Sequence, residues 1–175
     1  MALTSMFKSK IDSLQDLYID QLKDLYDAEN QIIKALPQMI EAASSPDLKN
    51  ALKHHLGVTR TQKQRLEQAF ERLGQEAGAE TCKGIRGIIE EGQDLMSRLE
   101  EPAVRDAGLI VAAQKVEHYE IAGYGGARAF ANTLGYDDVV RLFQQTLDEE
   151  GEADKKLTQI AESHRNIEAK QTAGR

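Results

Sequence analysis

Three features of the 175-residue sequence predict an all-α fold, a four-helix bundle of two helical hairpins with an additional crossover helix. Residues that favour helices (Leu, Ala, Glu, Lys and Gln) abound, while Trp is absent and aromatic residues make up only 5%. There are three prolines, and no run of alternating β-branched residues suggests a sheet. Apolar residues recur at i, i+3 and i+4 spacing along most of the chain, as in helices with one buried face.

Charge and composition exclude several classes of function. The formal net charge is −7, and acidic and basic residues are interspersed, which argues against nucleic acid or an anionic membrane as the main partner. The single cysteine, Cys82, rules out an internal disulfide and fits a reducing compartment. Residues 1–10 lack the apolar run of a signal peptide, and no apolar segment reaches transmembrane length. We therefore expect a cytoplasmic protein.

The first helix is predicted to begin near Ser9 or Ser13 and to end near residue 43. Its apolar row consists of Leu14, Tyr18, Leu22, Leu25, Ile32, Leu36, Met39 and Ala43. Glu29 interrupts this row, which places a carboxylate on the side that faces the core. Pro37 is expected to kink the helix, because proline removes a backbone donor and clashes with the preceding turn.

The second helix is predicted over residues 46–73, with Ser45 as its N-cap and Pro46 at its first position. His55 and Gln62 are polar members of its otherwise apolar row. His55 is either a hydrogen-bonded core histidine or a metal ligand.

Glycines at 74 and 78 then interrupt the chain before a shorter third helix, predicted over residues 81–99. At 1.5 Å per residue this helix would be about 28 Å long, enough to cross the bundle between the two hairpins. Glu91 lies on its flank, and its role is left open.

The fourth and fifth helices are predicted over residues 102–134 and from Asp137, as a cap, to about His164. Glycines at 123, 125 and 126 suggest a close helix approach or a local irregularity. Domain boundaries follow: an N-terminal segment (1–10), a bundle (11–165) and a polar tail expected to fray (166–175).

Glutamates occupy three of the four equivalent positions in the two hairpins. Glu29 and Glu120 each lie 15 residues before their turn, and Glu150 lies 13 residues after its turn, so each is roughly 20 Å along its helix. The fourth equivalent position holds Val58. Any one glutamate could equally lie at the solvated edge of its row, but three at matched depth favour the carboxylate metal site of a helix bundle. Glu117 is expected at the surface or behind the ligands.

Several segments resemble the bacterial YciE/YciF (DUF892) family of ferritin-like proteins. The segments are Leu-Tyr-Asp-Ala-Glu-Asn-Gln (25–31), His-Leu-x-x-Thr-x-x-Gln (55–62), Ile-Ile-Glu-Glu-Gly (88–92), Val-Glu-His-Tyr-Glu-Ile-Ala (116–122) and Thr-Leu-Asp-Glu-Glu (146–150). The resemblance implies a ferritin-like bundle of about five helices, associated with stress in bacteria, often dimeric, with a dimetal site. It also implies acidic ligands at Glu29, Glu120 and Glu150, with Asp154 and Gln62 nearby.

One departure from the family pattern bears on the number of metal ions. The family has a Glu-Thr pair on the second helix, whereas here Val58 precedes Thr59. A symmetric two-metal site then lacks one oxygen ligand. The centre is expected to be dinuclear, or mononuclear and completed by His55, Gln62 or water, or lost.

Two functions follow from these residues. In the first, oxygen-rich ligands with at most one imidazole favour iron or manganese, which would react with peroxide or dioxygen. Tyr124 would serve as a hydrogen-bonding or redox neighbour, or simply pack in the core. In the second, the chain is a metal-free, non-catalytic dimeric stress protein whose site is degenerate at Val58.

Overall fold

The computed structural model describes residues 10–172, whose regular secondary structure consists of helices, with no strand among them. The elements in chain order are α1 (Leu14–Ala42), α2 (Pro46–Arg72), α3 (Lys83–Met96), α4 (Pro102–Thr133), α5 (Asp137–Ile160), the π-helical turn η1 (Ala161–Arg165) and α6 (Asn166–Thr172). The all-α prediction is confirmed. None of the described helices is both long enough and apolar enough to cross a membrane.

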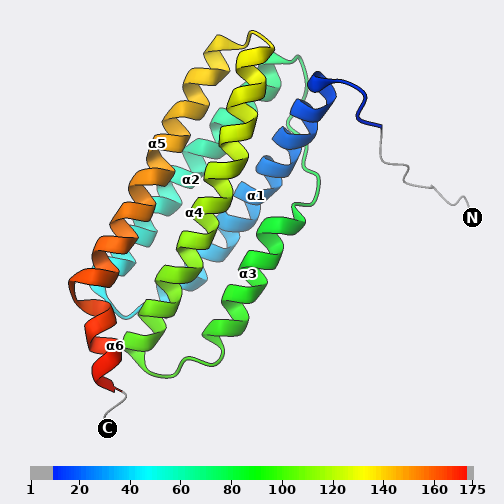
Figure 1. The fold of residues 1–175 in the computed structure, drawn as a ribbon. Coiled ribbons are helices and arrows are strands. Elements are labelled where there is room, and N and C mark those ends of the chain that lie inside the picture. Colours follow the sequence, from blue (N-terminus) through cyan, green and yellow to red (C-terminus); the bar gives the residue numbers. More distant parts are fainter. Residues whose placement is uncertain (1–9, 173–175) are drawn as a thin grey trace, which may run out of the picture.

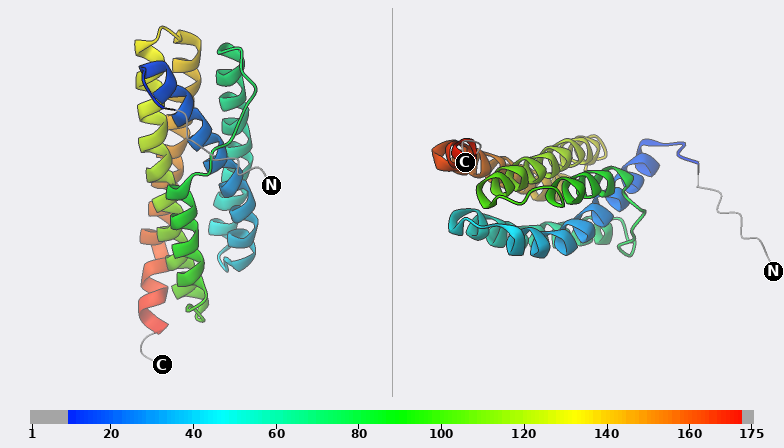
Figure 2. Two further views of the ribbon diagram at one scale, coloured as in Figure 1. Left: turned by 90° about the vertical axis from the view of Figure 1, so that its right-hand side faces the viewer. Right: turned by 90° about the horizontal axis from the view of Figure 1, so that it is seen from below.

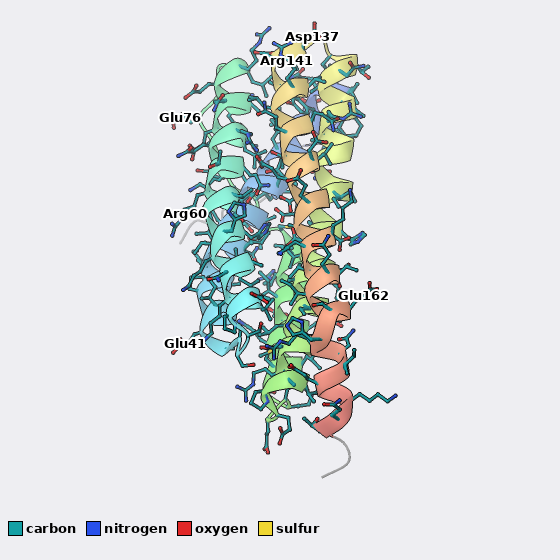
Figure 3. The ribbon with its side chains drawn as sticks, turned by 90° about the vertical axis from the view of Figure 1, so that its left-hand side faces the viewer. Glu41, Arg60, Glu76, Asp137, Arg141 and Glu162 are labelled. Carbon is teal, nitrogen blue, oxygen red and sulfur yellow. The ribbon has the colours of Figure 1, made fainter. Side chains whose placement is uncertain are left out.

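Two antiparallel hairpins form the bundle, α1 with α2 and α4 with α5 (Figure 1). The view from below in Figure 2 (right) shows the α1–α2 hairpin as one layer and α3, α4 and α5 as the other. α1 also packs on α4, and α2 on α5, so the four long helices enclose a common core. Charged side chains such as Arg60 and Glu162 project outward from the helices (Figure 3).

The hairpin turns form where their sequence signals predict. The Ser45 side chain caps α2 by accepting a hydrogen bond from the Leu48 N–H, and Pro46 occupies the first turn. Gly135 follows α4 with a φ of 80°, a left-handed conformation that glycine adopts without strain. The N-cap of α5 is Tyr136 rather than Asp137, which instead lies in the first turn, where a carboxylate is favourable beside the helix N-terminus.

Asp106 ties the two hairpins together. Its carboxylate is fully buried and accepts hydrogen bonds from the backbone N–H groups of Ser44 (2.7 Å) and Ser45 (2.8 Å) and from the Ser44 hydroxyl (2.7 Å). The turn between α1 and α2 is thereby fixed against the start of α4.

The crossover helix is shorter than predicted. α3 contains 14 residues, about 21 Å at the usual helical rise, and an irregular segment, residues 73–82, covers the rest of the return path beside α1 (Figure 1). Cys82 determines where α3 begins, because its backbone N–H donates to Asp27 (2.8 Å) and its carbonyl accepts from Gln31 (3.1 Å), both on α1. This anchor depends on a tertiary contact, so the local sequence does not reveal it.

The C-terminal end also differs from the prediction. The helix continues through η1 into α6, which packs on α4 and reaches Thr172, where a polar tail was expected to fray from residue 166. Arg165 lies 3.7 Å from the buried Asp106 carboxylate, which holds this end against the bundle. The proposed segment 1–10 falls almost wholly outside the described residues, as do residues 173–175.

The apolar core is divided into two clusters. One, toward the α4–α5 turn, includes Tyr18, Leu66 and Phe143. The other, toward the α1–α2 turn, includes Ile32, Leu52 and Leu109 and is covered by α3. Between them lie buried polar side chains, chiefly Glu29, His55, Gln62, Glu117, Glu120 and Glu150.

The glycines of α4 provide a test of this packing. The helix runs unbroken through them, and a Cβ at Gly123 would lie 2.8 Å from Cδ2 of the buried Leu25, whereas one at Gly126 would meet nothing within 4 Å. Gly126→Ala should therefore raise the free energy of unfolding by about 1 kcal/mol through helix propensity. Gly123→Ala should lower it by about 1 kcal/mol through overpacking. Urea denaturation of the two variants measures both values, and equal effects would contradict the close approach of α1 and α4.

Candidate metal centre

Four helices bring side chains to the polar layer between the two apolar clusters. α1 provides Glu29, α2 provides His55 and Gln62, α4 provides Glu117 and Glu120, and α5 provides Glu150. Each of these residues is at most 7% exposed. The three glutamates predicted at matched depth therefore all lie in the core, on three different helices.

His55, Glu117, Glu120 and Glu150 form the tightest group. Each offers one ligand atom, and these atoms all lie within 4.8 Å of one another. Nε2 of His55 is 3.4 Å from a carboxylate oxygen of Glu117. One nitrogen and three carboxylate groups at this spacing could hold a metal ion.

Glu29 extends the group on the α1 side. Its carboxyl group lies close to that of Glu120, and its Oε1 accepts a hydrogen bond from the Tyr124 hydroxyl. Glu117 and Glu150 form a second close pair of carboxyl groups. Because ionised carboxylates have no donor, each of these contacts requires either a shared proton or a cation.

Helix α2 places two polar side chains, His55 and Gln62, on either side of Val58, where the family pattern has a glutamate. Val58 is half-buried and lies on the wall of a cavity between α2 and α5, together with His55 and Glu117. Gln62, one turn further along α2, donates its Nε2 to Oε1 of Glu150 and, at 3.2 Å, to Glu149. The Thr59 hydroxyl donates to the His55 carbonyl (2.8 Å) and so belongs to the helix itself.

Arg65 on α2 places one positive charge near the buried glutamates. It donates two hydrogen bonds to Glu149, at 2.6 and 2.7 Å, and one to the Thr146 hydroxyl at 3.1 Å. Glu149 thus orients both Gln62 and Arg65 from outside the cluster. Since Arg65 is already paired, it leaves most of the charge on the inner glutamates uncompensated.

Two residues predicted for the site lie outside it. Asp154 is partly exposed and accepts a hydrogen bond from Gln114 (2.9 Å), with His118 at 3.4 Å, because it lies one turn beyond Glu150 on the side of α5 that faces α4. Glu91 is exposed and pairs with Lys115 at the α3–α4 surface. Neither carboxylate joins the buried group.

Two residues are more central than the sequence indicated. Glu117 was expected at the surface or behind the ligands, yet it is 2% exposed and belongs to the tightest group. α4 packs against α1, α3 and α5, so more than one row of its surface is buried. Glu117 lies three residues before Glu120, and this spacing places both on one helix face. The spacing could therefore have predicted that Glu117 is buried with Glu120. Arg65 had no comparable signal, because its partner Glu149 is on another helix.

Burial dominates the electrostatics of the site. It raises the pKa of Glu29, Glu117 and Glu120 well above the ordinary value of 4.5, and repulsion from neighbouring carboxylates adds to the effect. Burial also raises the pKa of the Tyr124 hydroxyl, with Glu29 and Glu120 as further causes, so Tyr124 remains a donor. The pKa of His55 is lowered by burial, which favours the neutral imidazole that binds metals.

The unsatisfied polar atoms test whether these residues fit a metal ion. Among the described residues, ten buried side-chain nitrogen or oxygen atoms lack a hydrogen-bond partner. Seven of the ten belong to this site: Oε2 of Glu29, Nε2 of His55, Oε1 of Gln62, Oε2 of Glu117, both carboxylate oxygens of Glu120 and Oε2 of Glu150. Buried polar atoms are normally satisfied, so this concentration of free lone pairs fits a cation.

The fold and the site together define a ferritin-like helix bundle with a buried carboxylate–histidine cluster that could hold a metal ion. The family model described as "Domain of unknown function (DUF892)" matches residues 13–170, and the chain belongs to this family. Protein YciF of Escherichia coli K12 is 39% identical over 162 residues, covering 92% of this chain and 98% of that protein.

Solved structures agree with the fold. YcfI from Rhodopseudomonas palustris has a TM-score of 0.84 at 43% identity, covering 87% of this chain and 97% of that one. The E. coli stress protein YciF has a TM-score of 0.83 at 39% identity, covering 86% and 96%. A protein from Xanthomonas campestris is 18% identical with a TM-score of 0.70, covering 91% and 99%, and it supports the fold alone.

The raised glutamate pKa values predict how the stability of metal-free protein depends on pH. Above pH 4.5 the unfolded glutamates release protons that Glu29, Glu117 and Glu120 retain in the fold. Their contribution to stability is therefore complete below pH 4.5 and is lost as the pH rises toward the raised values. Each such group should lower the free energy of unfolding by about 1 kcal/mol per pH unit in that range.

Urea denaturation of chelator-treated protein between pH 5 and pH 8 measures this slope. Glu120→Gln removes one of the three titrating groups, so its slope should be shallower by about 1 kcal/mol per pH unit. Glu152→Gln, which changes an exposed carboxylate on α5, serves as the control. Equal slopes in the two variants would contradict the burial of a protonated Glu120.

Proposed function

We propose that this protein binds iron or manganese in the polar layer of the bundle and that the bound metal reacts with peroxide or dioxygen. The observation that carries the proposal is the set of seven unsatisfied nitrogen and oxygen atoms, all on side chains that converge between two apolar clusters. Oxygen-rich ligands with one imidazole suit iron or manganese better than copper.

The surrounding residues would hold the ligands in position. Gln62 and Tyr124 donate to Glu150 and Glu29, so each of these carboxylates keeps its second oxygen free for the metal. Such outer hydrogen bonds fix ligand orientation and strengthen metal binding. When bound, a redox metal would supply electron transfer to or from a small oxidant, and the cavity between α2 and α5 gives polar molecules a route to His55 and Glu117.

E. coli YciF is a stress protein, and this supports a similar role for this chain, because the two are 39% identical over nearly their whole lengths. We extend that role to this protein as part of the proposal, together with a cytoplasmic location and a homodimeric state.

A second possible function is supported by a separate observation. The close carboxyl pairs, Glu29 with Glu120 and Glu117 with Glu150, can each share a proton, which would reduce the buried charge without a metal. The chain would then be a non-catalytic helical stress protein, with Val58 as the sign of a degenerate site.

Metal content separates the two functions. Protein purified without chelator should contain at least one iron or manganese ion per chain, and Glu120→Ala should weaken binding tenfold or more by removing a ligand. Glu91→Ala, which removes an exposed carboxylate paired with Lys115, should bind as the wild type does. Elemental analysis and manganese titration measure these values. Negligible metal in all three proteins would exclude the metal function and favour the second.

Val58→Glu tests the number of ions. A carboxylate at this position would add the oxygen ligand that the family pattern has and this chain lacks, so manganese stoichiometry should rise from one to two per chain, or affinity should rise at least tenfold. Gly57→Glu is the matched control, because Gly57 is adjacent on α2 but exposed. Unchanged stoichiometry and affinity in Val58→Glu would show that this position does not face the metals.

A further inference from the structure

A second cavity reaches the same group of residues from the opposite side. It lies between α1, α3 and α4, has a volume of about 280 Å³, and is lined mainly by apolar side chains, among them Ile32, Leu36, Met39, Ile88, Ile89 and Met96. Its wall on α4 extends from Leu109 to Glu117, about 12 Å along the helix axis. The cavity is therefore an elongated apolar space parallel to the bundle.

Polar atoms are present at its inner end. His55 and Glu117 both line this cavity, and they are only 7% and 2% exposed. Nε2 of His55 and Oε2 of Glu117 have no hydrogen-bond partner. An apolar space with a few convergent polar atoms at one end is the usual form of a small-molecule site.

The cavity between α2 and α5 makes the apolar one unnecessary as an entrance for ions or peroxide. That larger space, about 630 Å³, also reaches His55 and Glu117, and its wall includes His54, Glu152 and Lys155. Hydrated ions and polar oxidants would follow this polar route. The wall of the apolar cavity is mostly carbon, with Gln38 and Gln93 as its other polar side chains, so it offers them few hydrogen bonds and suits a molecule with a long apolar part.

We propose that the cavity between α1, α3 and α4 binds an unbranched aliphatic molecule with one uncharged head group, an alcohol or an aldehyde. The chain lies along α4 and the head group meets His55 and Glu117. This inference goes beyond the proposed metal function and does not depend on it, because the apolar lining is present with or without a metal.

The head group is uncharged because of what surrounds it. A carboxylate head would be removed from water beside Glu117, Glu120 and Glu150 with no cation to pair with, because Arg65 is bound to Glu149, and burying an unpaired charge is costly. A hydroxyl group can donate to the free oxygen of Glu117 without adding charge. Met39 and Met96 line the cavity with flexible side chains, which adapt to chains of different length.

Binding of hexanol, octanol and decanol to the full-length, chelator-treated protein tests the proposal, with displacement of the apolar fluorophore N-phenylnaphthylamine as the readout. Affinity should rise about fourfold for each added methylene until the chain fills the cavity. Decanol should bind at least tenfold more tightly than decanoate. An affinity that does not rise with chain length would overturn the site, and tighter binding of decanoate would overturn the uncharged head group.

Two matched substitutions locate the binding. Ala112 lines the apolar cavity and Ala153 lines the polar one, and both are half-buried alanines in long helices. Ala112→Leu should weaken decanol binding tenfold or more by filling the space, whereas Ala153→Leu should leave it within twofold. Equal losses in the two variants would contradict the assignment.

An enlarging substitution guards against the case in which Ala112→Leu disturbs the fold. Met39→Ala widens the cavity, so the chain length of tightest binding should shift toward dodecanol, with helical content unchanged by circular dichroism. An unchanged chain-length preference would overturn the proposal. Because every titration uses metal-free protein, failure of the metal function would leave this result unaffected, and failure of alcohol binding would leave the metal measurements unaffected.

Discussion

The cost of placing four carboxylates in a medium of low dielectric constant constrains the whole bundle. Glu29, Glu117, Glu120 and Glu150 lie between two apolar clusters, almost wholly removed from solvent, and the neighbouring Arg65 is already paired with Glu149. Such a layer is stable only when protons or a cation offset the charge. The polar layer thus couples the stability of the fold to the occupancy of the site.

The hairpin architecture explains how this layer forms. Each hairpin carries acids or donors at a similar distance from its turn, and antiparallel packing of the hairpins brings them to one level. α2 is the exception, because Val58 replaces the family glutamate and the helix contributes His55 and Gln62 from the neighbouring turns instead. The result is asymmetric, with three carboxylates and the imidazole on one side and Glu29 with Tyr124 on the other.

Much of the fold and part of the site could be predicted from the sequence. Helix periodicity and the Ser45–Pro46 cap are local signals, and Glu29, Glu120 and Glu150 stand out because each interrupts or joins an apolar row. The remainder depends on contacts between helices. The start of α3 depends on Asp27 and Gln31, the burial of Glu117 depends on its neighbours His55 on α2 and Glu150 on α5, and the position of Asp154 depends on Gln114. The cavities depend on side-chain packing throughout and leave no trace in residue spacing.

The Asp106 carboxylate has a consequence for how this chain can vary. It joins α4 to the turn at Ser44 and Ser45, and from this joint His55 lies ten residues along α2 and Glu117 eleven along α4, both about 15 Å away. The Asp106 contact fixes the starts of α2 and α4 relative to each other, so the number of residues from this contact sets the level at which His55 and Glu117 lie in the bundle. A one-residue deletion in either arm would rotate its ligand by about 100°, so length changes in relatives should be confined to the opposite end of the molecule or to the connection before α3.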